Sequence, residues 1–138
     1  MVKVRLKIMK NRTQIDAIAL VNSGYASRRP ELLVPRHIAE ALGIYPMLPS
    51  HARISRYRVA SGSIVELVKI EDCAKVKVIE DDRESDVVNV DLVIAPHAAI
   101  PLMSDRLISK LGIVILDAGE GLWCFRDEIG KRVRRSMR

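Results

Sequence analysis

Residues 15–24, IDAIALVNSG, decide the fold of this chain. The stretch becomes continuously apolar over residues 17–21, which is typical of a strand that enters a protein core. The apolar run stops abruptly at Asn22, Ser23 and Gly24, three residue types that favour a turn. We therefore expect a buried strand over residues 15–21 that ends in a short polar loop.

Further strands are expected on both sides of this stretch. Residues 2–9, VKVRLKIM, alternate apolar and basic residues at period two, as in an exposed or edge strand. Residues 54–60 and 64–70 are rich in β-formers and flank Ser61-Gly62-Ser63, a pattern that predicts a hairpin. The same reasoning predicts strands at about 74–80, 87–95, 113–116 and 122–125.

Two short helices are expected between these strands. Pro35 begins PRHIAEALGI, where proline suits the first helical turn and Gly43 supplies the stop. Ser104 and Asp105 can cap a second helix, which runs to Leu111 and ends at a glycine. Strands therefore predominate, and the chain is predicted to be all-β, with a closed or partly closed barrel and two short helices.

The length and charge distribution predict one domain and a basic tail. The chain has 138 residues, 49% of them hydrophobic, which suits one folded domain and argues against disorder. Its net charge is +6, but residues 131–138 carry five basic residues and no acid, and the remainder carries 18 basic and 17 acidic residues. We therefore expect a single domain over 1–130 and a frayed, solvated tail over 131–138. Binding of the tail to phosphate backbones is a less favoured alternative.

The remaining composition predicts a cytoplasmic protein without metal or cofactor. Cys73 and Cys124 lie far apart and form no CxxC pair, so we expect reduced structural thiols. The histidines at 37, 51 and 97 lack metal-ligand spacing. No stretch has the length of a membrane span or the core of a signal peptide. A single Gln among many charged residues favours a heat-adapted source.

Four segments occur in an order that resembles retropepsin-like aspartic peptidases. They are ALVNSGYAS, LLVPRHIAEALGI, RVASGSIVELVKI and LVIAPHAAIPLMSDRLISKLGIVILDAGEGLW, and the resemblance covers residues 13–125. It implies a retropepsin-like closed barrel with a flap hairpin, in a prokaryotic or archaeal member of the family. It also implies a homodimer, because each subunit of this family supplies half of the active site. Strands 2–9 and 122–125 are then candidates for the dimer contact.

The resemblance also assigns site residues. Asn22 stands where the family has its catalytic aspartate, Ser23 would be the supporting hydroxyl, and Gly24 would allow the two loops to approach closely. The tip of the flap, which closes over an extended peptide, would be formed by Ala60, Ser61 and Gly62. An ordinary turn after a strand and a plain hairpin loop remain the alternatives for these two segments. Met103 and Ser104 also depart from the family, many members of which carry a glycine before the last helix.

Asn22 occupies the position that would carry out the proposed chemistry. In this family two aspartates share one proton, so that one carboxylate activates water while its partner stays protonated. An asparagine amide cannot take the proton from water, and we expect the chain as written to be inactive. Either Asn22 replaces an aspartate in an otherwise active aspartic peptidase, or the protein is a natural pseudo-peptidase. A non-catalytic module that binds peptides or nucleic acid is the rival interpretation.

Overall fold

The computed structural model describes residues 1–21 and 24–138, which form ten strands, two α-helices and one 3-10 helix. The strands are β1 (Val2–Lys10), β2 (Thr13–Val21), β3 (Glu31–Val34), β4 (Arg53–Arg58), β5 (Ile64–Val78), β6 (Val88–Ile94), β7 (Leu102–Met103), β8 (Ile113–Asp117), β9 (Leu122–Phe125) and β10 (Arg134–Arg135). The helices are α1 (Arg36–Ala41), α2 (Asp105–Lys110) and η1 (Arg126–Glu128).

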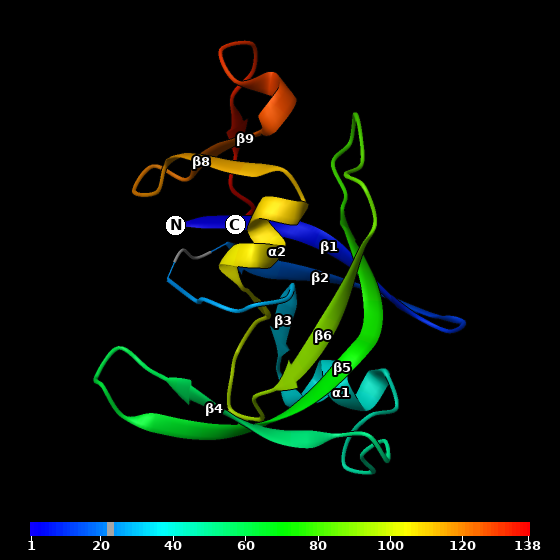
Figure 1. Cartoon of the computed structure of the whole chain (residues 1–138). Helices are drawn as coiled ribbons and strands as arrows, with labels where there is room; N and C mark the ends of the chain where they lie inside the picture. The colour runs from blue at the N-terminus through cyan, green and yellow to red at the C-terminus, as the bar shows by residue number, and fades with distance from the viewer. Residues whose placement is uncertain (22–23) are drawn as a thin grey trace.

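Six of the strands close into a barrel (Figure 1). They follow the order β1-β2-β7-β3-β6-β5, and β5 returns to β1 through pairs that run from Leu6–Val78 to Met9–Lys75. Strand β4 pairs with β5 and extends the sheet as a hairpin beyond the barrel. The prediction of an all-β closed barrel with two short helices is therefore confirmed.

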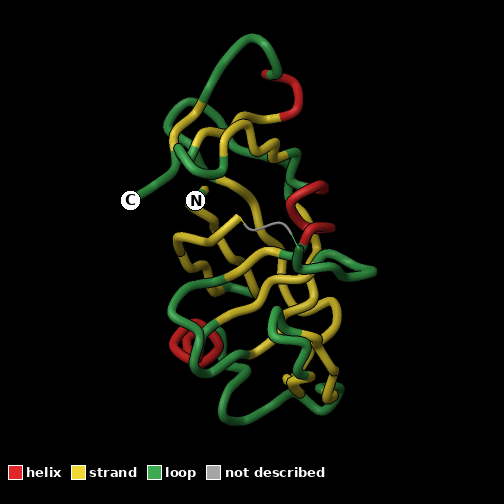
Figure 2. Tube along the Cα trace, turned by 90° about the vertical axis from the view of Figure 1, so that its left-hand side faces the viewer, coloured by secondary structure: helices red, strands yellow, loops and turns green. Residues whose placement is uncertain are grey.

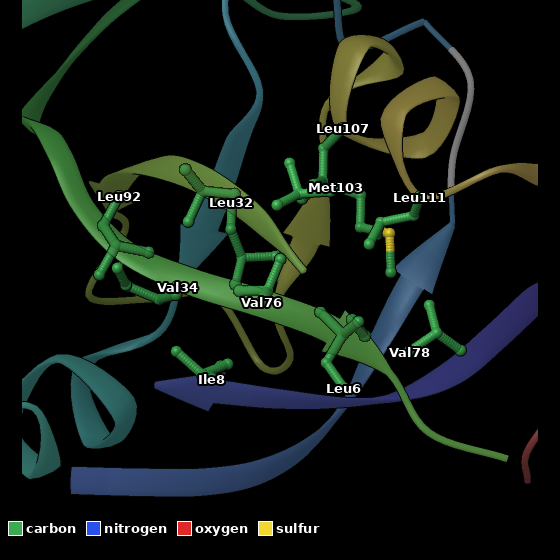
Figure 3. Close-up of a cluster of buried hydrophobic side chains, with 14 of the residues drawn as sticks. Leu6, Ile8, Leu32, Val34, Val76, Val78, Leu92, Met103, Leu107 and Leu111 are labelled. Atoms are coloured by element: carbon green, nitrogen blue, oxygen red, sulfur yellow. The ribbon is translucent and has the colours of Figure 1, made fainter. Parts of the chain in front are cut away.

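Strand β1 lines the barrel interior along one face. Its alternate residues Val2, Val4, Leu6 and Ile8 are almost fully buried, and Figure 3 shows Leu6 and Ile8 among the core side chains. The period-two pattern is confirmed, but the expectation of an edge strand is wrong, because β1 pairs with both β2 and β5. Barrel closure gives a strand two neighbours and still leaves its polar face in water.

Strand β5 is longer than the sequence pattern predicted. The expected strands at 64–70 and 74–80 form one strand, which contains a β-bulge between Ile70 and Ala74. Inside the bulge Asp72 has a φ of 50°, and its N–H donates to the carboxylate of Asp91 at 2.8 Å. The polar residues that interrupt the apolar pattern are thus accommodated without ending the strand.

Both predicted helices are present and begin as expected. Helix α1 follows Pro35, and helix α2 begins after Ser104, whose side chain accepts a hydrogen bond from the N–H of Leu107 at 3.2 Å. Leu107 and Ile108 bury one face of α2 in the core. Helix α2 follows β7 directly and packs against β3, β6 and β8.

The C-terminal segment belongs to the fold. Strand β10 pairs with β9, Met137 N–H donates to the carbonyl of Lys3 at 2.8 Å, and the two termini lie close together (Figure 2). The Arg134 guanidinium is almost fully buried and contacts the carboxylates of Glu128, Asp82 and Glu80. The expectation of a frayed tail is wrong for residues 134–137, since these contacts hold them in place. The domain boundary after residue 130 remains a prediction.

Candidate functional site

The loop after β2 is fixed to helix α2. Asn22 and Ser23 lie outside the described residues, and Gly24 is the first described residue after β2. Its φ of 105° lies in a region that favours glycine. Its N–H donates to both carboxylate oxygens of Asp105, at 3.0 and 3.2 Å. In return, the Asp105 N–H donates to the carbonyl of Tyr25 at 2.7 Å. Gly24 and Tyr25 are therefore held against the start of α2.

The hydroxyl of Ser104 strengthens this junction. It is fully buried and accepts hydrogen bonds from the N–H groups of Glu31, at 3.0 Å, and Leu107, at 3.2 Å. One side chain thus joins the start of β3 to the start of α2. The sequence predicted the helix cap, but neither the bond to β3 nor the bond between Asp105 and Gly24 had a local signal.

A group of charged residues built on two buried carboxylates lies beside this loop. Lys69 Nζ is 2.8 Å from Glu31 and 3.7 Å from Asp91, and both carboxylates are almost fully buried. Arg29 donates to the two oxygens of Asp91 through Nε, at 3.0 Å, and Nη2, at 2.7 Å. Two carboxylates and two cations therefore balance each other next to the candidate loop. None of these four residues had a local signal in the sequence.

Two tyrosines complete the group. The hydroxyls of Tyr25 and Tyr57 donate to the same oxygen of Glu31, at 2.8 and 3.1 Å. Their rings meet edge to face with centroids 6.2 Å apart. Burial, with the nearby Glu31 charge, raises the pKa of both phenols well above the ordinary value, so both remain protonated donors. We call these residues the Glu31 cluster: Tyr25, Arg29, Glu31, Tyr57, Lys69 and Asp91.

The predicted hairpin is confirmed between β4 and β5. Ala60, Ser61 and Gly62 are exposed at its tip, which is closed by a hydrogen bond from Val59 N–H to the Ser63 carbonyl at 2.9 Å. Figure 1 shows the hairpin projecting from the barrel on the side where the loop between Gly24 and β3 lies. The role of these three residues as a flap tip stays a prediction.

An apolar cavity lies at the end of β2. It has a volume of about 410 Å³ and includes Met1, Val2, Leu20, Val21 and Ile115 in its lining. Met1 is 65% exposed, although it is a large apolar side chain. The chain thus presents an apolar hollow directly before position 22.

The cysteines and the potential metal ligands do not form a site in the described part of the chain. Among residues 1–21 and 24–138, no group of three His, Cys, Asp or Glu side chains is placed to hold a metal ion. Cys73 and Cys124 are both free, and burial raises the pKa of each thiol. In the described part of the chain, no helix reaches the length and apolarity that a membrane span needs.

No protein-family model matches the chain, and no curated protein matches it in sequence. Among solved structures it is similar to the retroviral protease-like domain of Ddi1 from Leishmania major. The two chains are 11% identical, with a TM-score of 0.47, and the match covers 91% of this chain and 89% of that one. Identity at this level does not transfer residue roles from one chain to the other.

Proposed function

We propose that this chain is one subunit of a retropepsin-like homodimer that holds an extended peptide between residues 22–24 and the hairpin tip at 60–62. The observation that carries this proposal is the joint placement of the two elements. Gly24 is bonded to Asp105, while Tyr57 of the hairpin and Tyr25 of the loop share Glu31 as acceptor. The loop and the hairpin therefore border the same region of the barrel surface. An extended peptide would add there as a strand.

The proposed chemistry depends on position 22. With aspartate at this position in both subunits, the pair would share a proton and activate water for peptide hydrolysis. The amide of Asn22 has a similar shape but does not accept that proton. The chain as written is therefore proposed to bind peptides and to leave them intact, whether Asn22 is an introduced replacement or the residue of a natural pseudo-peptidase.

The dimer contact is proposed to form around the end of β2. A twofold axis beside position 22 would bring Met1, Leu20 and Val21 of both subunits together, and these residues border the apolar cavity. Strands β1 and β9 each have partners on both sides within the chain. A contact through these two strands would therefore use side chains instead of further backbone pairing.

The peptidase proposal is tested by the variant Asn22→Asp. Purified parent and variant are incubated with denatured casein between about pH 4 and 7, where a shared-proton dyad titrates, and fragments are identified by mass spectrometry. We expect cleavage by Asn22→Asp, its inhibition by pepstatin, and none by the parent. Asn22→Ala is the matched control, because it changes the same position without supplying a carboxylate. A folded Asn22→Asp dimer that does not cleave would remove the peptidase proposal and leave peptide binding.

Nucleic-acid binding is the second candidate, and the structure weakens its basis. Of the basic residues in 131–138, Arg132 and Arg134 contact carboxylates of the chain itself. Lys131, Arg135 and Arg138 remain exposed. Replacement of the two arginines by glutamate is a better test than deletion, since residues 134–137 belong to the fold. Salt-sensitive binding of single-stranded DNA that the double variant abolishes would support this function.

A further inference from the structure

The Glu31 cluster places a costly group of charges between the loop and the hairpin. The carboxylates of Glu31 and Asp91 and the ammonium of Lys69 are largely removed from water, whereas the Arg29 side chain is half exposed. Removing charges from water carries a large desolvation penalty, and apolar residues of similar volume often stabilise a fold as well or better. A role beyond stability is therefore worth seeking for the cluster. Its members come from the loop after Gly24, from both strands of the hairpin, and from barrel strands β3 and β6. The cluster stands where these three parts of the molecule meet.

We propose that Glu31 is a positioning residue that couples the flap hairpin to the candidate loop. This inference rests on the proposed function, because it concerns the same groove. When the hairpin moves over a bound peptide, the hydrogen bonds at Glu31 transmit the change to Tyr25, next to Gly24. The loop and the hairpin then adopt their peptide-bound arrangement together.

The two oxygens of Glu31 divide the contacts in a way that suits this role. Oε1 accepts from Tyr25 of the loop and from Tyr57 of β4. Oε2 lies 2.8 Å from Lys69 of β5. One buried carboxylate therefore holds the start of the loop and both strands of the hairpin. A movement of either strand changes the hydrogen bonding of the group that also holds the loop.

Asp91 anchors the other end of the loop and the β5 bulge to the barrel. It fixes the far end of the loop through Arg29 and the β5 bulge through the N–H of Asp72. Asp91 lies on β6, inside the barrel wall, and is fully buried. The loop is thus anchored to the barrel at Arg29, whereas at Tyr25 it shares its anchor with the hairpin.

The hairpin depends on such inward contacts because β4 is the last strand of its sheet. Its outer face carries Arg56 and Arg58, which are exposed, while Tyr57 points inward to Glu31. Tyr57 also lies close to the tip, two residues before Val59. Loss of its hydroxyl should therefore loosen the tip more than it loosens the barrel.

Hydrogen–deuterium exchange of the full-length parent chain tests the coupling without any need for catalysis. Tyr57→Phe is expected to speed amide exchange at residues 58–64 by about fivefold, the effect of losing one hydrogen bond. Tyr25→Phe is expected to speed exchange at the same residues to a similar extent, although Tyr25 is not part of the hairpin. Tyr45→Phe is the matched control, since Tyr45 packs against Arg36 outside the cluster.

The coupling predicts a non-local effect, and that effect decides the test. If Tyr57→Phe speeds exchange of the hairpin and Tyr25→Phe does not, the contact is local and the proposal is wrong. Unchanged exchange in both variants would overturn it as well. In the Asn22→Asp chain, each variant should raise KM for casein by about fivefold and leave kcat nearly unchanged. Absence of cleavage in Asn22→Asp itself would count against the peptidase proposal, while the exchange result would still decide the coupling.

Discussion

The backbone N–H of Gly24 donates to both carboxylate oxygens of Asp105, at 3.0 and 3.2 Å. This contact joins the residue that follows position 23 to the first turn of α2. Since Asp105 N–H also donates to the Tyr25 carbonyl, the loop is held by two bonds to one residue. The local structure at the candidate site therefore depends on a side chain 81 positions away in sequence.

Replacing Asp105 with alanine should loosen this loop. We expect a loss of about 1–2 kcal/mol in the free energy of unfolding, because a charge-assisted hydrogen bond and a favourable carboxylate at a helix N-terminus are removed together. Urea unfolding followed by circular dichroism measures the loss. Asp86→Ala changes an exposed carboxylate elsewhere and is the control. Equal stability of both variants would show that the bond at Gly24 contributes little.

Ser104→Ala should lower the stability of the fold by more than the loss of one small hydroxyl group suggests. The buried hydroxyl accepts from two N–H groups, and alanine would leave both without this acceptor. We expect a loss of about 2 kcal/mol, combining a lost helix cap with an unsatisfied buried donor. Thermal unfolding of Ser104→Ala beside Ser109→Ala, an exposed serine of the same helix, measures the difference. A loss no larger than that of the control would contradict this interpretation.

Arg134→Ala is expected to destabilise the C-terminal sheet. The Arg134 guanidinium contacts Glu128, Asp82 and Glu80. When it is removed, the largely buried carboxylate of Glu128 loses its main partner. Breaking a buried ion pair on one side costs about 3–5 kcal/mol. Arg135→Ala, the exposed neighbour, should change stability little. Denaturant unfolding of the two variants gives the comparison, and similar stabilities would exclude a structural role for Arg134.

The same contacts predict a loss of stability in acid. Hydrogen bonds from Arg134 lower the pKa of Glu128 from its ordinary value of 4.5 to about 2. A folded-state pKa below the unfolded value gives stabilisation that is complete above the unfolded pKa and is lost as the pH falls through the folded one. The pKa of Asp82 is lowered by the same guanidinium and acts in the same direction.

We therefore expect the free energy of unfolding to fall between about pH 5 and pH 2. This window runs from the unfolded-state pKa of Glu128 down to its folded-state pKa. Glu128→Gln should be less stable than the parent at neutral pH and should lose less stability in this window, because glutamine does not titrate. Glu120→Gln at an exposed turn is the control. Parallel pH curves for the parent and Glu128→Gln would contradict the assignment.

The local elements could be predicted because their signals lie within a few residues. Pro35 and Gly43 bracket α1, Ser104 caps α2, and glycine and serine mark the hairpin tip. The extent of the strands was harder to predict. The polar residues around Asp72 suggested that the strand ends there. Instead a bulge accommodates them, and the N–H of Asp72 donates to Asp91, which lies on another strand.

The buried ionic contacts could not be predicted, since their partners are distant in sequence. Arg29 and Asp91 are 62 positions apart, and Arg134 and Asp82 are 52 positions apart. Composition shows that such charges exist but not which of them pair. For this reason the last residues resembled a free basic tail, although Arg134 is among the most buried polar residues of the chain.

The most direct test of the account is cross-linking between two copies of position 22. The variant Asn22→Cys with Cys73→Ser, oxidised under mild conditions, should form a covalent dimer, because disulfides require Cα atoms within about 4.4–6.8 Å of each other. Thr13→Cys with Cys73→Ser, at the far end of β2, is the control and should remain uncross-linked. A covalent dimer through position 22 alone is the predicted result. A monomer in sedimentation, or a dimer in which position 22 does not cross-link, would contradict the shared site on which the proposed function depends.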